Sequence, residues 1–144
     1  MRRRFRRSTE KRQYRRIILI AHEGAKTEKN YFQSIARYSE NVYVKLIRSD
    51  HKSSPHYVLK RLNRQIEKED LARTDEAWLV VDRDSWPEDE MSRLLDWAES
   101  EENYNLAVSN PKFEYWLVLH FEDGYAIVTS SECDRRLRRC IPNY

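Results

Sequence analysis

The chain lacks several features that mark common protein classes. It has 2 glycines among 144 residues, which excludes a P-loop, a GxGxxG motif and a glycine-rich linker. Its 2 cysteines, Cys133 and Cys140, form no CxxC pair and no metal-type cluster, and we expect them to be reduced thiols. The longest apolar run, residues 17–21, is far shorter than the roughly 20 residues that a membrane-spanning helix needs. We therefore expect a cytoplasmic protein with no membrane segment.

The net charge is small, but positive charge is concentrated at the N-terminus. There are 27 Lys and Arg residues and 24 Asp and Glu residues, a formal net charge of +3. Residues 1–16 contain nine basic residues and one acid, a sum of +8, so residues 17–144 carry −5. We expect residues 1–14 to form a flexible basic arm. Such an arm can contact phosphate backbones or serve only as a solubilising tail, and the sequence leaves both interpretations open.

Residues 15–144 alternate between short apolar runs and amphipathic stretches, which predicts one α/β domain. The expected strands cover residues 17–21, 42–47, 77–81 and 106–108. The expected helices follow them, over residues 27–39, 55–73, from 87 onward and 110–121. This alternation is typical of a Rossmann-like three-layer domain with a mainly parallel four-stranded sheet. Ligands bind beyond the carboxyl ends of the strands in such sheets, so we looked for chemistry there.

Acidic and amide side chains follow three of the expected strands. The first strand leads into His22-Glu23-Gly24, the third into Asp82-Arg83-Asp84 and the fourth into Ser109-Asn110. Carboxylates gathered in one crevice repel one another, and a divalent cation relieves that repulsion. Mg²⁺ fits best because it takes one or two carboxylates and keeps waters that a phosphate can replace. A DxD motif alone more often serves turn or cap chemistry, but a Glu-Gly after the first strand makes the pattern more specific.

The order of these motifs resembles that of known proteins. A strand followed by Glu23-Gly24, and a later strand followed by Asp82-x-Asp84, is similar to the Toprim domain of topoisomerases, bacterial primases and OLD-type nucleases. Residues 21–32, 78–84 and 109–121 resemble the RloB-like family more closely, and the resemblance covers about residues 15–125. Members of that family usually continue beyond the position of Tyr144, so we expect the C-terminal part to be short relative to the family.

The resemblance implies a Toprim-like fold, a metal site and a nuclease activity. By position, Glu23 would be a metal ligand or the general acid/base, and Asp82 and Asp84 would bind Mg²⁺ or Mn²⁺. Gly24 would let the substrate backbone approach closely. The expected reaction is cleavage of phosphodiester bonds in DNA or RNA, with tRNA one candidate, in a prokaryotic anti-phage defence system that can include an ATPase partner. The alternative is a non-catalytic module that binds nucleic acid or a partner protein.

Four further residues are candidates for the same site. Lys26 stands before a predicted helix N-terminus, where phosphate is favoured, although a solvated lysine explains it equally well. Arg83, between the two aspartates, is expected to contact substrate. Asn110 is expected to cap the following helix first and to face the site second. Glu114, one turn beyond the fourth strand, is a candidate fourth acid.

Two other interpretations concern the same stretches. Trp116 and His120 share a helix face with apolar residues, so we expect both in the core. A phosphoacceptor receiver domain also uses acids at strand ends. It would place its acid pair after the first strand and a single aspartate after the third, which is the reverse of the order here. We rank the receiver domain last.

Overall fold

The computed structural model describes residues 15–48 and 54–144, so the predicted basic arm, residues 1–14, lies outside the described residues. The described elements are β1 (Arg16–His22), α1 (Thr27–Ala36), β2 (Val42–Leu46), α2 (Pro55–Glu69), β3 (Glu76–Asp82), the 3-10 helix η1 (Arg83–Ser85), α3 (Glu88–Glu99), β4 (Tyr104–Ser109), α4 (Phe113–Val118) and α5 (Ser130–Cys140). The predicted alternation of strand and helix is confirmed. Helix α5 was not predicted from the sequence.

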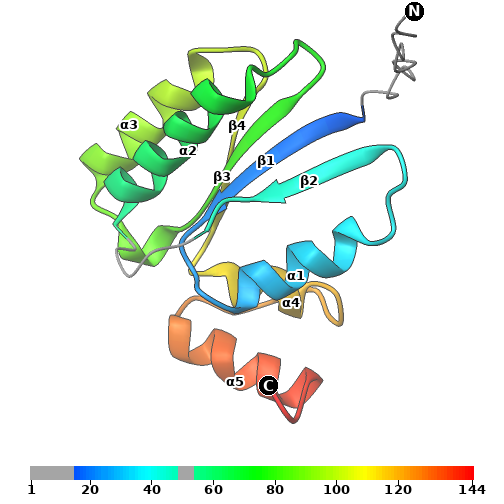
Figure 1. Ribbon diagram of the computed structural model, residues 1–144. Helices are drawn as coiled ribbons and strands as arrows, with labels where there is room; N and C mark the ends of the chain where they lie inside the picture. The colour runs from blue at the N-terminus through cyan, green and yellow to red at the C-terminus, as the bar shows by residue number, and fades with distance from the viewer. Residues whose placement is uncertain (1–14, 49–53) are drawn as a thin grey trace, which may run out of the picture.

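The described strands form one four-stranded sheet in the order β2-β1-β3-β4, and every pair is parallel. Strand β1 is central because its run of apolar residues can be buried on both faces. Helices α2 and α3 cover one face, and α1 and α4 lie on the other, with α5 beyond α4 (Figure 1). This is a three-layer Rossmann-like arrangement, as expected. Since all the strands are parallel, their carboxyl ends meet at one edge.

Side chains alternate across the sheet, so each face has its own core. On one face Leu19 and Leu79 pack against Leu62 of α2 and Leu94 of α3. On the other face Ile20 and Val80 pack with Phe113 of α4 and with partly buried aromatic residues of α1. Burying each of these large apolar side chains contributes roughly 1.5–3 kcal/mol. A third cluster, Val118, Cys133 and Leu137, attaches α5 to α4.

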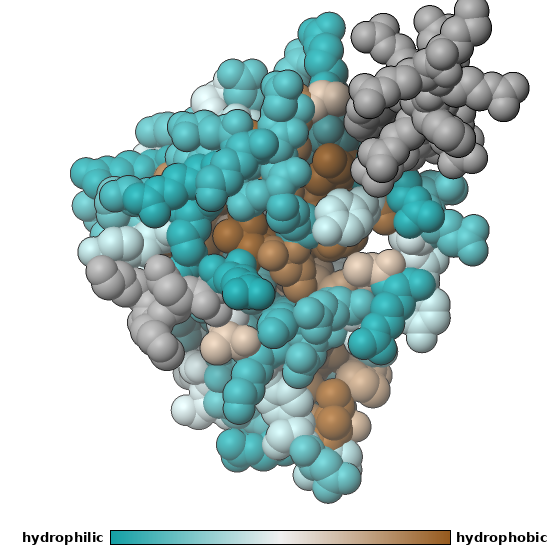
Figure 2. All heavy atoms as spheres, in the orientation of Figure 1, coloured by the Kyte–Doolittle hydropathy of each residue, from teal (hydrophilic) through white to brown (hydrophobic). Residues whose placement is uncertain are grey.

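The face of the sheet beneath α1 is not fully covered. A cavity of about 670 Å³ lies there, lined by residues that include Phe32, Trp78 and Phe113. Figure 2 shows brown apolar side chains between the teal helices of the two layers. None of the helices in the described ranges has the length and apolar character needed to cross a bilayer.

Helix α4 departs from the prediction at both ends. It covers Phe113–Val118, and its N-cap is Lys112, so the expectation that Asn110 caps this helix is wrong. Trp116 is 46% exposed and His120 is exposed as well, so placing both in the core was also wrong. The Trp116 indole N–H donates to Tyr31 Oη at 2.8 Å, and His120 Nε2 lies 3.2 Å from the same oxygen. The side of α4 that carries them therefore faces α1, and Trp116 also lines the open cavity on that face of the sheet.

Candidate functional site

Glu23 connects the ends of the two central strands. It directly follows β1, and its Oε1 accepts a hydrogen bond from the backbone N–H of Asp82 at 3.2 Å. The same oxygen accepts the indole N–H of Trp86, which lies just after η1. Because β1 and β3 are adjacent and parallel, with His22 opposite Val80, the residues that follow them come together at the carboxyl edge. The structure therefore brings Glu23 and Asp82 together.

Asp82 is the last residue of β3 and points toward the start of α4. Its Oδ1 accepts the backbone N–H of Phe113, the first residue of that helix, at 2.9 Å. A helix leaves the N–H groups of its first turn unpaired, and this bond satisfies one of them. The side chain of the N-cap residue, Lys112, makes no such bond. Asp82 thus joins β3 to α4 while its carboxylate stays beside Glu23.

Glu28 is a member of this site that the sequence reasoning missed. It lies in the first turn of α1 and is only 6% exposed. Its carboxylate occupies the space beside Gly24, where an added Cβ would lie 1.8 Å from Glu28 Oε2. The absence of a side chain at Gly24 therefore has an explanation inside the protein, in addition to the substrate approach expected from the resemblance. A glycine four residues before an acid, in a chain with 2 glycines, was the available signal.

Glu114 lies in the first turn of α4, half-buried and close to the end of the chain. The hydroxyl of Tyr144 donates to Glu114 Oε1 at 3.1 Å and lies 2.8 Å from Thr27 Oγ1. The position of Glu114 suits the predicted fourth acid, because its negative charge raises the pKa of both Glu28 and Asp82. We call Glu23, Glu28, Asp82 and Glu114 the acid cluster.

Burial and mutual repulsion make the acid cluster hard to ionise fully. Burial, followed by the charge of Asp82, raises the pKa of Glu23 to about 8, although hydrogen bonds from Asp82 and Trp86 oppose this shift. Burial and then the charge of Glu28 raise the pKa of Asp82 to about 6, against the hydrogen bond from Phe113. Burial also raises the pKa of Glu28. Near neutral pH the cluster therefore holds protons that isolated carboxyls would have lost.

The remaining predicted residues lie around the cluster rather than in it. Asp84 is exposed in η1, its N–H donates to the carbonyl of Pro111 at 3.1 Å, and its charge is not among those that raise the pKa of Glu23 or Asp82. Arg83 Nη1 donates to the carbonyl of Trp86 at 2.8 Å, which steadies the residue that holds Glu23. Lys26 and Asn110 are both exposed.

His22 orders the turn that carries Glu23 and Gly24. It is buried, and its Nδ1 lies 2.8 Å from the carbonyl oxygen of Gly24. A carbonyl only accepts, so Nδ1 carries the proton of this bond. Burial lowers the pKa of His22, so the ring is neutral near pH 7. Its Nε2 has no hydrogen-bond partner among the residues that the structure describes.

The donor chemistry of the cluster fits a hard divalent cation. Among residues 15–48 and 54–144, no three His, Cys, Asp or Glu side chains are arranged to bind a metal ion together. Glu23 nevertheless bonds to the backbone of Asp82, and the charge of the Asp82 carboxylate acts on Glu23. Mg²⁺ commonly binds through one or two carboxylates with water in its other positions. The residues present therefore fit a site with two protein ligands, and the other two acids add negative charge around it.

One comparison with known proteins gave a match. The model of a family described as RloB-like protein matches residues 18–144. This range contains every member of the acid cluster and all the described elements except the first residues of β1. No curated protein and no solved structure matches the chain.

Proposed function

This chain belongs to the RloB-like protein family, and we propose that it is a divalent-metal-dependent nuclease of DNA or RNA with a Toprim-like acid site. The observation that carries the proposal is the contact between Glu23 and Asp82, which joins the carboxyl ends of the two central parallel strands. Ligands of open α/β sheets bind at this edge. Two adjacent carboxylates there suit a phosphate substrate only when a cation offsets their charge.

The proposed roles follow from the surroundings of each side chain. Glu23 and Asp82 would hold Mg²⁺ or Mn²⁺, and the bound ion would stabilise the attacking and leaving oxygens of the phosphodiester. In the metal-free protein the pKa of Glu23 is raised to about 8, so binding the ion as a carboxylate would release a proton near neutral pH. The alternative role of Glu23, general acid/base, applies if Asp82 holds the ion without it. The indole of Trp86 donates to one carboxylate oxygen of Glu23, which fixes the orientation of the carboxylate and therefore of its other oxygen. The buried Glu28 increases the attraction for a cation.

A cleavage assay tests the proposal. Labelled single-stranded DNA, duplex DNA and tRNA are incubated with Mg²⁺ or Mn²⁺, and with EDTA. Glu23→Gln and Asp82→Asn should each lower the rate by about 100-fold or more, whereas Asp96→Asn, a carboxylate exposed on α3, should keep full activity. Cleavage that persists in EDTA, or in both cluster variants, would contradict the proposal. Asp84→Asn distinguishes a two-carboxylate site, which it leaves active, from the three-carboxylate site that the DxD motif suggests.

A non-catalytic module that binds nucleic acid or a partner protein is the second candidate. It is favoured by the finding that no three metal-binding side chains are grouped in the described part of the chain. In this case all three substrates stay intact with either metal while binding is retained. The same assay therefore decides between the two candidates.

The biological setting is a further part of the proposal. The resemblance suggests a prokaryotic anti-phage defence system in which an ATPase is a partner. Expression of the chain, with its genomic neighbours, should then lower the efficiency of phage plating, and Asp82→Asn should abolish this effect. Equal plating with the wild type and the variant would show that the acid cluster has no part in defence.

A further inference from the structure

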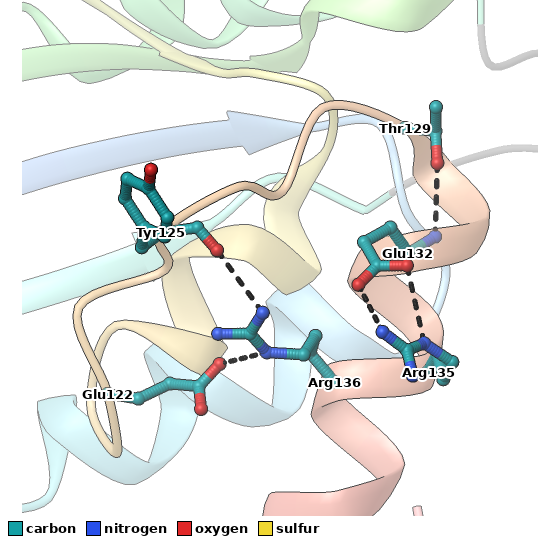
Figure 3. Close-up of polar contacts among 6 residues, drawn as sticks. All are labelled: Glu122, Tyr125, Thr129, Glu132, Arg135 and Arg136. Atoms are coloured by element: carbon teal, nitrogen blue, oxygen red, sulfur yellow. Dashed lines mark hydrogen bonds and ion pairs between the residues drawn. The ribbon is translucent and has the colours of Figure 1, made fainter.

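The loop between α4 and α5, residues 119–129, is held in one conformation by bonds from α5. Arg136 Nε donates to Glu122 Oε1 at 2.5 Å and its Nη1 donates to the carbonyl of Tyr125 at 3.2 Å (Figure 3). Within the loop, Asp123 Oδ1 accepts the N–H of Tyr125 at 3.0 Å. Thr129 then caps α5 by accepting the N–H of Glu132 at 3.2 Å. The backbone on both sides of Tyr125 is therefore ordered.

The backbone conformation of this loop is unusual. Gly124 has φ +70° and Ala126 has φ +62°, and the left-handed region is unfavourable for a residue with a Cβ such as Ala126. A Cβ at Gly124 would lie 2.9 Å from side-chain atoms of Leu119 and Tyr115. The chain thus accepts backbone strain and tight packing to keep the loop in this shape.

The ordered loop packs Ile127 against the cluster of α4 and α5, but it leaves two other large side chains in solvent. Tyr125 is 81% exposed and Val128 is 80% exposed. In Figure 3 the ring of Tyr125 points away from Arg136, which bonds to the backbone carbonyl of Tyr125 and not to the ring. Burial of these side chains does not explain the order of the loop. A rigid, exposed aromatic ring is the form in which proteins offer a stacking surface.

Helix α5 adds positive charge beside this loop, because its Arg136 bonds to the backbone of Tyr125. Its buried side, Cys133 and Leu137, faces α4, so Arg135 and Arg139 lie on the opposite side, with Arg138 next to them. Arg135 is already paired with Glu132. Arg138 and Arg139 are exposed, and neither takes part in a hydrogen bond or ion pair with any residue that the structure describes. We call Arg135, Arg138 and Arg139 the arginine ridge.

Helix α5 is joined by ion pairs to residues at both ends of α4. On one side, Asp134 is paired with Lys112 at 2.6 Å, and Lys112 directly precedes the residue whose N–H Asp82 accepts. On the other side, Arg136 is paired with Glu122 of the loop. A helix with its side chains is about 10 Å across. The arginine ridge lies on the side of α5 that faces away from α4, so roughly that width separates the ridge from α4.

We propose that the arginine ridge and Tyr125 form a binding surface for single-stranded nucleic acid, which leads the strand across α5 to the acid cluster. Guanidinium groups bind phosphates, and an exposed tyrosine ring stacks on a base. The bases of a duplex are already stacked on one another, so only an unpaired strand offers a free base face together with a line of phosphates. The proposal rests on the proposed function, because it names the substrate class of that site.

Binding is measured in EDTA, so that cleavage plays no part, with the full chain and a fluorescein-labelled oligothymidylate of about 15 nucleotides. The double variant R138Q/R139Q should bind about tenfold more weakly and reduce the slope of log affinity against log salt by about 1.4, since each lost phosphate contact removes about 0.7. The control K60Q/R64Q removes the same charge from exposed positions of α2, on the other face of the sheet, and should bind like the wild type.

The aromatic part is tested separately. Tyr125→Ala should weaken binding to the oligothymidylate by about tenfold with an unchanged salt slope, whereas Val128→Ala, an exposed neighbour in the same loop, should have no effect. A hairpin duplex of the same length should bind more weakly than the single strand, and equally to wild type and Tyr125→Ala. Equal binding of the oligothymidylate by Tyr125→Ala and wild type would overturn the single-strand assignment. Equal losses in R138Q/R139Q and K60Q/R64Q would overturn the surface.

These outcomes are independent of the proposed nuclease activity. If the ridge and Tyr125 variants lose binding but no substrate is cleaved with either metal, the surface stands and the nuclease proposal fails. If Asp82→Asn abolishes cleavage while the ridge and Tyr125 variants bind and cleave normally, the nuclease stands and the surface is wrong. A loop that serves a protein partner instead would give this second result.

Discussion

Replacing Glu23 with glutamine should stabilise the metal-free protein above neutral pH and leave it almost unchanged in acid. The pKa of Glu23 is about 8 in the folded chain and 4.5 for an ordinary glutamate. The folded state therefore binds more protons than the unfolded state between these values, and stability falls as pH rises through that window. Below about pH 4.5 both states are protonated and the penalty is absent, and above about pH 8 it is complete. Glutamine stays neutral throughout and can still accept the bonds from Asp82 and Trp86.

The size of the effect follows from the shift. Each pKa unit corresponds to about 1.4 kcal/mol, so the shift of Glu23 sets an upper limit of about 5 kcal/mol. The side chain is only partly buried, and solvent screens a share of this energy. We therefore expect Glu23→Gln to raise the free energy of unfolding by about 1–3 kcal/mol near pH 8.5 and by less than about 0.5 kcal/mol near pH 4.5.

Urea unfolding in EDTA, followed by circular dichroism at both pH values, measures this difference. The indole N–H signal of Trp86 in an NMR titration reports the ionisation of Glu23 directly, because that group donates to its carboxylate. The signal should titrate near pH 8 in the wild type and stay flat in Glu23→Gln. Asp96→Asn, which removes an exposed carboxylate, is the control and should follow the wild type. If Glu23→Gln is no more stable than the wild type near pH 8.5, the assignment of Glu23 as a buried, repelled carboxyl is wrong.

Three further predictions follow from the acid cluster and the arm. Millimolar Mg²⁺ or Mn²⁺ should raise the melting temperature of the wild type at pH 8 but not that of Asp82→Asn, because a ligand that binds only the folded state stabilises it. An unchanged wild-type melting curve in thermal scans would favour the non-catalytic binding module. Gly24→Ala should lower the free energy of unfolding, measured by urea titration, by about 1–3 kcal/mol, because its Cβ would meet the Glu28 carboxylate. The double variant with Glu28→Ala should recover much of this stability, and if it does not, the clash with Glu28 is not the cause. Deleting residues 1–14 should weaken nucleic-acid binding and flatten its salt dependence, measured by fluorescence anisotropy, while thermal scans still show the metal-induced melting shift. An unchanged affinity and salt slope would show that the arm is only a solubilising tail.

The sequence alone was sufficient for the architecture. Apolar runs such as residues 17–21 predict buried strands, and the apolar spacing of residues 55–73 predicts a helix, because each pattern reflects a local backbone period. The structure has both, although helix α2 ends earlier, at Glu69. Alternation of the two then requires crossovers and favours a parallel sheet, which the structure has. Glu23 and Asp82 could also be placed at one edge, since each adjoins the end of a strand.

The membership of the acid cluster depended on where the chain turns between these elements. A strand period would direct Asp82 and Asp84 to the same side, but the chain changes to the 3-10 helix η1 directly after Asp82, and Asp84 is exposed. Glu28 joins the cluster because α1 folds back over Gly24. Neither the turn after Asp82 nor the turn at Gly24 has an apolar pattern in the sequence that would predict it.

The same distinction applies to the C-terminal part. Trp116 and His120 have the spacing of core residues, yet they stay exposed and make polar contacts with Tyr31 of α1. The loop that presents Tyr125 is ordered by Arg136, eleven residues later, and nothing in its own sequence predicts this bond. Local backbone preferences determined the strands, most of the helices and the sheet. Which side chains meet, and which remain exposed, was decided by packing between residues that are distant in the sequence.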